Sequence, residues 1–76
     1  MTRLPRMTGE ELVAALGRAG FEAVRQRRSH VRVQHPDGRR TTVPLHAGEM
    51  IGPGLLSQIL RQLEISRGDW LRLTSE

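Results

Sequence analysis

The feature that most constrains this fold is an alternation of apolar and polar residues over His30–Gln34. Val31 and Val33 alternate with polar neighbours, which is the period of a strand with one buried face. A turn follows at residues 36–38, where proline presets its backbone angle and glycine tolerates a positive one. Arg40–Leu45 then alternates again, so the sequence predicts an antiparallel hairpin.

A third strand is predicted over Phe21–Arg27, just before the hairpin. Simple alternation puts Phe21, Ala23 and Arg25 on one face of this strand. In the alternative arrangement, Phe21 anchors the end of the preceding helix while Val24 faces the core. In both cases the three segments form an antiparallel three-stranded sheet.

Helices are predicted on both sides of these strands. Thr8–Glu11 fits a capping box at the start of a helix over Gly9–Ala19, and Gly20 is a natural stop. Pro53 suits the first turn of a second helix, and Trp70 marks a short third one. We therefore predict an α+β fold of order α-β-β-β-α plus a short helix, with the helices on one face of the sheet.

The 76 residues suffice for one small domain. We expect residues 1–7 to be a flexible tail and residues 8–76 to form the domain. The sequence has no apolar run near the ~20 residues of a membrane span, and its N-terminus lacks the apolar core of a signal peptide. We expect a cytoplasmic protein without membrane association.

Charge points to an anionic partner. The chain has 12 basic residues, all arginine, against 8 acidic ones, for a net charge of +4. Arginine binds phosphate through paired hydrogen bonds, and a basic domain is typical of nucleic-acid binding. A merely soluble basic protein is the alternative. Because Phe21 and Trp70 are the only aromatic residues, a stacking platform for single-stranded bases is disfavoured.

The candidate catalytic residue is His30, which strand alternation places on the open face of the sheet. Arg32, Gln34, Arg40 and Thr42 are expected on the same face. An exposed histidine is often only a polar surface residue. Among phosphate-binding arginines, however, an imidazole can take a proton from a ribose 2′-OH as a general base. The arginines would stabilise the charge that develops at phosphorus.

The other two histidines are weaker candidates for a catalytic role. His35 is expected to be a solvated turn residue. His46 begins the 46–52 loop, where it is a loop anchor, an RNA contact or a second proton-transfer group, and we favour the first two. The chain has no cysteine, and its scattered histidines make a poor metal set, so we expect no metal and no cofactor.

Four motifs in this order resemble the HicA family, small toxins of type II toxin–antitoxin pairs. They are Ser29-His30, His35-Pro36-Asp37-Gly38-Arg39, Val43-Pro44-Leu45-His46-Ala47-Gly48-Glu49 and Gly54-Leu55-Leu56-Ser57-Gln58-Ile59-Leu60-Arg61-Gln62-Leu63. The resemblance covers about residues 8–73. Each motif is loose alone, but their order and spacing together are fairly specific.

The resemblance implies a double-stranded-RNA-binding-domain-like fold and a ribosome-independent mRNA endonuclease (mRNA interferase) whose catalytic histidine is His30. It also implies a HicB-type antitoxin that covers the active face. Together with the arginine pattern, it leads us to expect RNA contacts at these residues: Arg28, Ser29, Arg32, Arg40 and His46.

Three positions depart from the family pattern. Arg28 stands where glycine is usual, Val33 where an aromatic is frequent, and Glu49 where lysine is frequent. Arg28 could add a phosphate contact or obstruct close backbone approach.

Two other classes of function remain open: a non-catalytic RNA-binding module of the same fold, and a DNA-binding or structural domain. The first would need basic residues at the start of the second helix, and Gly52-Pro53-Gly54 supplies none, which counts against it. The strand-rich middle argues against the helix-turn-helix expected of a DNA-binding domain.

Overall fold

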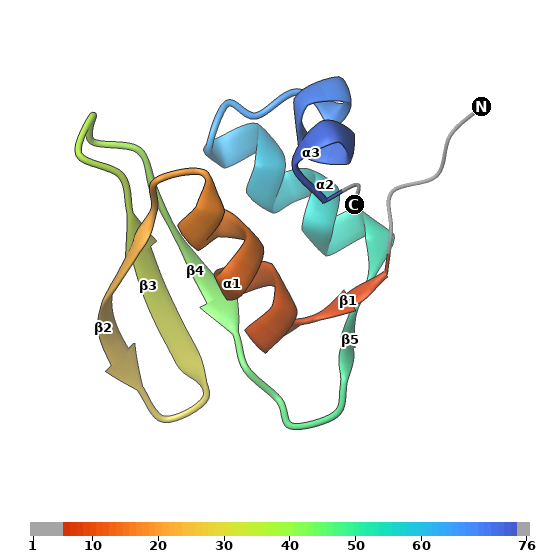
Figure 1. Cartoon of the computed structure of the whole chain (residues 1–76). Coiled ribbons are helices and arrows are strands. Elements are labelled where there is room, and N and C mark those ends of the chain that lie inside the picture. Colours follow the sequence, from red (N-terminus) through yellow and green to blue (C-terminus); the bar gives the residue numbers. More distant parts are fainter. Residues whose placement is uncertain (1–5, 75–76) are drawn as a thin grey trace.

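The computed structural model describes residues 6–74, which form short helices and strands (Figure 1). In chain order the elements are β1 (Met7–Thr8), α1 (Gly9–Arg18), β2 (Glu22–Arg27), β3 (His30–Gln34), β4 (Arg40–Pro44), β5 (Met50–Ile51), α2 (Pro53–Gln62) and α3 (Arg67–Thr74).

The sheet is antiparallel, with strand order β2-β3-β4. Val31 pairs with Val43, and both are buried. Val33 pairs with Thr41, and these side chains are buried as well. Alternate residues of β3 and β4 are exposed, so one face of the sheet is packed and the other is open. The predicted α+β class and three-stranded antiparallel sheet are confirmed.

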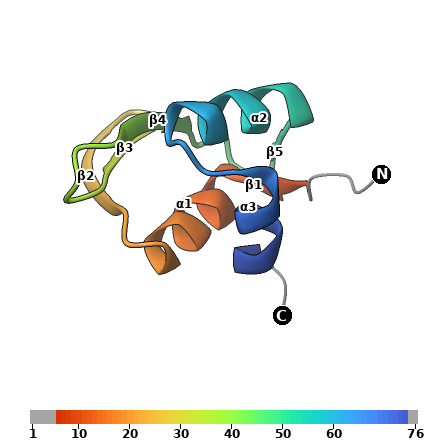
Figure 2. The ribbon, with the colours of Figure 1, turned by 90° about the horizontal axis from the view of Figure 1, so that it is seen from above.

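The helices supply the rest of the core. Viewed from above, α1 lies beneath the sheet, and α2 runs beside the edge strand β4 (Figure 2). Leu12 and Leu16 of α1, Leu56 and Leu60 of α2, and Trp70 of α3 are all buried in one cluster with the valines. Each large apolar side chain removed from water contributes about 1.5–3 kcal/mol. The core is thus completed by α1 behind the packed face and by α2 from beside β4, and the other face of the sheet is left open.

The start of α1 follows its sequence signature. Thr8 Oγ1 accepts a hydrogen bond from the Glu11 backbone N–H, and Glu11 Oε1 accepts one from the Thr8 N–H, at 3.1 and 2.8 Å. This capping box confirms the predicted helix start. Gly9 is buried against the end of β4, where a Cβ atom would lie 2.2 Å from the Pro44 carbonyl oxygen. The helix therefore depends on glycine at its first position.

The strand β2 departs from the expected alternation. The register skips one residue between Ala23 and Arg25, which makes Val24 the extra residue of a β-bulge. As a result Ala23 pairs with Val33, whereas Arg25 pairs with Arg32 and lies on the open face. The prediction that Ala23 and Arg25 share a face was wrong. The alternative that buried Val24 was also wrong, since half of its surface is exposed.

A second, two-stranded sheet was missed entirely. Met7 pairs with Ile51 and Thr8 with Met50, in antiparallel orientation. Met7 and Ile51 are buried, which places Met7 in the folded core instead of the expected tail. The 46–52 segment, expected to be all loop, contains β5. Of the expected tail, residues 1–5 lie outside the described residues.

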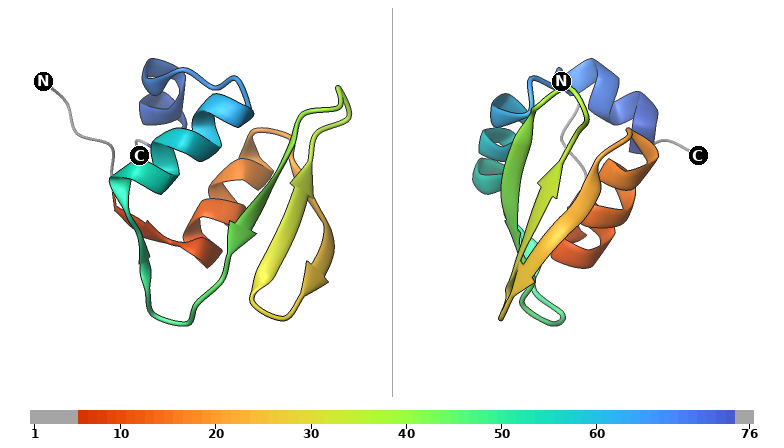
Figure 3. Two further views of the ribbon diagram at one scale, coloured as in Figure 1. Left: turned by 180° about the vertical axis from the view of Figure 1, so that it is seen from behind. Right: turned by 90° about the vertical axis from the view of Figure 1, so that its left-hand side faces the viewer.

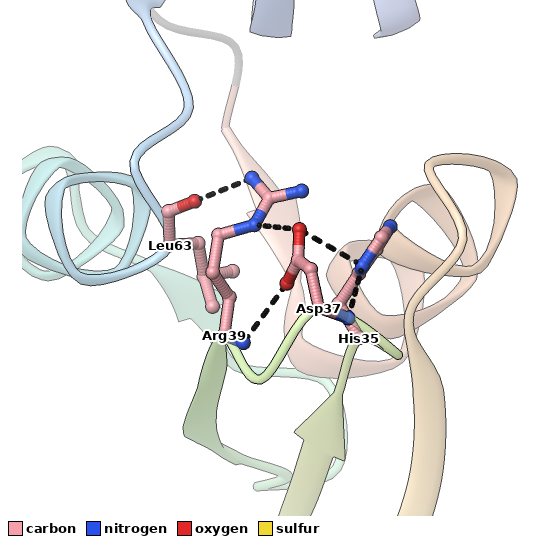
Figure 4. A network of polar contacts seen from close by, with 4 residues as sticks. All are labelled: His35, Asp37, Arg39 and Leu63. Carbon is pink, nitrogen blue, oxygen red and sulfur yellow. Dashed lines mark hydrogen bonds and ion pairs between the residues drawn. The ribbon is translucent and has the colours of Figure 1, made fainter.

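The turn between β3 and β4 is held by a network of polar contacts (Figure 4). Asp37 accepts hydrogen bonds from the backbone N–H and from Nε of Arg39, at 3.0 and 2.8 Å. These contacts, the backbone one first, hold the pKa of Asp37 below its usual range. Arg39 also donates to the carbonyl of Leu63 at 2.7 Å, which ties the turn to the end of α2.

His35 belongs to this turn as a packing residue. Its ring contacts Phe21 edge-on, with ring centroids 5.0 Å apart, and the guanidinium of Arg39 lies over the same Phe21 ring. The Nδ1 atom lies 3.1 Å from both the backbone N and the carboxylate of Asp37. When neutral, Nδ1 accepts from the N–H, and when protonated it pairs with the carboxylate. The expectation of a merely solvated His35 was therefore incomplete.

Candidate active site and nucleic-acid interface

His30 is the first residue of β3 and lies exposed on the open face of the sheet. It pairs with Arg27 on β2 and with Pro44 on β4. Its neighbour Val31 is buried, so strand alternation directs the imidazole away from the core. This is the position that the sequence predicts for it.

A shallow hollow of about 190 Å³ lies on the open face around this histidine. Its walls are formed by Arg25, Arg27, His30, Arg32 and Thr42. The strand register explains the set, because Arg25, Arg32 and Thr42 are opposite one another on three adjacent strands, and Arg27 is opposite His30. A histidine and three guanidinium groups thus surround one small space, which suits a phosphate group.

Arg25 and Arg27 were expected near His30 as basic neighbours, but they were not among the residues predicted to contact RNA. Arg25 was missed because simple alternation put it with Ala23, and the bulge at Val24 reverses that assignment. A usable signal was present in the turn between β2 and β3. Counting back from a two-residue turn places Arg27 opposite His30, and Arg25 opposite Arg32, on the same face.

Arg28 and Ser29 form that turn. Arg28 has a positive φ of 55°, a conformation that costs an ordinary residue about 1–2 kcal/mol and that glycine adopts freely. The positive φ explains why glycine is usual at this position in the family that the sequence resembles. The exposed Arg28 lies at the tip of the hairpin, outside the residues that line the hollow. The Ser29 carbonyl accepts a hydrogen bond from the backbone N–H of Leu45.

His46 lies beside His30 although the two are 16 positions apart in the chain. The two ring centroids are 6.3 Å apart, and the ring planes are inclined by 79°. The turn between β2 and β3 and the connection from β4 to β5 lie at the same end of the sheet (Figure 3, left). Nδ1 of His46 lies 4.0 Å from Oε2 of Glu49, and both side chains are largely exposed. The sequence contained no signal for the proximity of the two histidines.

A larger groove of about 430 Å³ adjoins the hollow and shares Arg32 and Thr42 with it. It runs between the open face of the sheet and α2. The lining residues are Arg32, Arg40, Thr41, Thr42, Leu55, Gln58, Ile59 and Gln62. The hydroxyl of Thr41 donates to Oε1 of Gln62 at 2.6 Å, which holds that amide against β4. The groove therefore offers two guanidinium groups and two amides next to the hollow, and its α2 wall was not predicted.

The predicted RNA contacts fall into two groups. Arg32 and Arg40 lie together in the groove on the open face. Arg28, Ser29 and His46 lie at one end of the sheet, around the turn between β2 and β3. His30 lies between these groups, since Arg32 follows it on β3 and His46 is beside its ring.

Residues 6–74 contain no group of three or more His, Cys, Asp or Glu side chains that could hold a metal ion. No helix within the same range is long and apolar enough to cross a membrane.

Comparison with known proteins identifies a family. Residues 9–65, which are most of the chain, match the model of a family described as the HicA toxin of bacterial toxin-antitoxin systems. The match spans α1 through the end of α2 and includes every residue of the hollow. A search of curated proteins finds no match.

Proposed function

The chain belongs to the HicA toxin family of bacterial toxin–antitoxin systems, and from this premise we propose that it is an endoribonuclease that cleaves mRNA with His30 as general base. The observation that carries the proposal is the hollow in which His30 is surrounded by Arg25, Arg27 and Arg32. A proton acceptor and phosphate-binding cations are two of the requirements for phosphodiester cleavage by transphosphorylation.

In this proposal the nucleophile is the RNA's own 2′-OH. The scissile phosphate binds in the hollow, and His30 takes the 2′-proton as the 2′-oxygen attacks phosphorus. The charge that develops on the phosphorane oxygens is stabilised by the arginines, whose guanidinium groups donate paired hydrogen bonds. The products are a 2′,3′-cyclic phosphate and a 5′-OH end, and no divalent metal takes part.

The flanking RNA is proposed to follow the groove between the open face and α2. Arg32 and Arg40 are the groove's guanidinium groups, and they would contact consecutive phosphates. Gln58 and Gln62 carry amides, which can donate to and accept from nucleobase edges. At the other end of the sheet, Arg28, Ser29 and His46 are proposed to contact the RNA on the far side of the scissile phosphate.

A toxin of this family has an antitoxin partner. We propose that this partner is a HicB-like protein with an acidic surface that docks over the open face. Such a surface would complement Arg28, Arg32 and Arg40, and it would cover His30 from RNA. Charge complementarity of this kind speeds association and makes it sensitive to salt.

The experiment that tests the function is cleavage of RNA by the purified chain in the presence of excess chelator. The expected result is cleavage with products that carry a 2′,3′-cyclic phosphate, or its hydrolysed form, and a 5′-OH. Loss of cleavage with chelator, or products with a 5′-phosphate, would contradict the metal-free mechanism. RNA binding without any cleavage, and without growth arrest on expression, would instead indicate a non-catalytic RNA-binding module.

A further inference from the structure

We propose that His46 is the general acid of the cleavage reaction, which protonates the 5′-oxygen as it leaves while His30 removes the 2′-proton. The inference rests on the proposed function. It assigns a residue to the step that His30 as general base does not perform, which is the protonation of the leaving 5′-oxygen. A 5′-alkoxide is a poor leaving group, so a proton donor at this oxygen lowers the barrier substantially.

The first observation is the distance between the two imidazoles. Their ring centroids are 6.3 Å apart, and both rings are exposed on the same end of the sheet. A general base and a general acid must each approach an oxygen of one phosphodiester to within about 2.6–3.2 Å. Rings at this separation can do so from two sides of a single phosphate, whereas a more distant histidine could not.

The second observation is that the backbone holds His46 in this place. The preceding residue, Leu45, donates its N–H to the Ser29 carbonyl, in the turn that immediately precedes His30. Pro44 pairs directly with His30 across β3 and β4. On the C-terminal side of His46 in the chain, the Glu49 N–H donates to the His46 carbonyl at 2.9 Å and closes a turn. The approach of the two histidines is therefore anchored from both strands.

The third observation is the distribution of charge around the two rings. Glu49 is the carboxylate beside His46, with Oε2 4.0 Å from Nδ1. The hollow around His30 contains the guanidinium groups of Arg25, Arg27 and Arg32. A carboxylate attracts an imidazolium ion, whereas guanidinium groups repel one. This asymmetry assigns the proton-donating role to His46 and the proton-accepting role to His30.

The step balances without any further reactant. His30 accepts the 2′-hydroxyl proton as the 2′-oxygen bonds to phosphorus. The bond from phosphorus to the 5′-oxygen breaks, and that oxygen takes the proton of His46. The products are the cyclic phosphate and the 5′-OH, with a protonated His30 and a neutral His46, and exchange with water restores both rings.

The test uses RNA in which sulfur replaces the 5′-oxygen at a linkage that the parent protein cleaves. A thiolate leaves without protonation, so the general acid becomes dispensable while the base does not. We expect His46→Ala to cleave the ordinary linkage about 10²–10⁴-fold more slowly than the parent, and the thio linkage at nearly the parent rate. His30→Ala should be slow on both linkages. Glu49→Gln should lower the rate on the ordinary linkage by a smaller factor and have little effect on the thio linkage.

A binding measurement separates this role from a simple RNA contact. On RNA with 2′-deoxyribose at the cleavage position, which cannot react, His46→Ala should bind only a few-fold more weakly than the parent, as expected for loss of one RNA contact, which is far less than its loss of cleavage rate. Parent-like cleavage of the ordinary linkage by His46→Ala would overturn the proposal. An equal loss on both linkages would do so too, since it indicates a role in binding or folding. Rescue of His30→Ala by sulfur, with no rescue of His46→Ala, would show that the roles are reversed.

The pH profile gives an independent readout. A reaction with one base and one acid falls off at both low and high pH. Replacing the 5′-oxygen by sulfur should remove the fall at high pH for the parent protein, because the protonated acid is then no longer needed. If the parent cleaves neither linkage, the proposed function itself fails, and this result differs from every outcome that tests His46 alone.

Discussion

Arg25 and Arg32 lie directly opposite each other on β2 and β3, on the open face of the sheet. Like charges directly opposite each other destabilise a sheet. In the proposed function, these two guanidinium groups and that of Arg27 in the same hollow bind the scissile phosphate. The pair therefore has a cost in stability that a bound phosphate group would offset.

This arrangement predicts opposite effects of one substitution on stability and on binding. Arg25→Gln should raise the free energy of unfolding slightly, because it removes the repulsion, and it should weaken RNA binding. Urea unfolding and RNA titration at low salt measure the two effects. Arg18→Gln, on α1 beneath the packed face, makes the same charge change and should leave RNA binding intact. A destabilised Arg25→Gln protein would refute the repulsion argument.

The central prediction for activity concerns His30. Because this ring is exposed and is not part of the buried hydrophobic cluster, His30→Ala should keep nearly the parent's unfolding midpoint. Its cleavage rate should fall by about 10²–10⁴-fold, as expected for loss of a general base. Expression of the parent in a bacterium that lacks the antitoxin should arrest growth, and expression of the alanine variant should not. Growth arrest by the variant at parent strength would rule out the proposed role.

Binding along the groove should depend strongly on salt. Each phosphate neutralised on a single strand contributes about −0.7 to the slope of log K against log salt concentration. Arg32→Ala and Arg40→Ala should each weaken binding and make this slope less steep by about that amount, because each removes one phosphate contact. Arg18→Ala is the matched control, which should change neither quantity. If both groove variants bind as the parent does, the RNA surface lies elsewhere.

Docking of the antitoxin should protect one face of the molecule. In the complex, backbone amides of β3 and of the turn between β2 and β3 should exchange more slowly with solvent, and Arg28, His30, Arg32 and Arg40 should lose exposure. The backbone amides of α1, which lies on the other side of the sheet, should exchange at the same rates as in the free toxin. Protection confined to α1 would mean that inhibition does not work by covering His30.

Two glycines of α1 provide a matched test of packing. Gly9→Ala should destabilise the fold by at least about 1–3 kcal/mol, because the new Cβ would lie 2.2 Å from the Pro44 carbonyl oxygen. Gly17→Ala meets nothing within 4 Å and should stabilise the fold by up to about 1 kcal/mol. Both values come from urea unfolding. Equal effects of the two substitutions would show that α1 does not pack against the end of β4 as described.

Local features of the fold were predictable because they depend on neighbours in sequence. The capping box of Thr8 and Glu11 spans three residues, and the alternation of Val31 and Val33 needs only the period of a strand. The same period placed His30 on the open face. The α+β class followed from the order of these local signals, and the arrangement of motifs along the chain indicated the family that the comparison identifies.

The composition of the site was decided by the pairing of one segment with another. The bulge at Val24 moves Arg25 to the open face, and it arises from the register between β2 and β3. The pairing of Met7 with Ile51 joins residues 44 positions apart, and neither short segment carries a strand pattern of its own. Alternation within one strand does not predict such contacts, because each of them depends on the register between two paired segments.

The sequence by itself determined that one histidine would stand among arginines on an exposed strand face. Only the tertiary structure decided that a second histidine, His46, would stand 6.3 Å from His30. The difference has a simple physical reason. The direction of a side chain on a strand follows from the backbone geometry of that strand alone. The distance between two side chains on different segments follows from the register of β3 with β4 and from the hydrogen bond between Leu45 and Ser29, which form only when the whole chain folds.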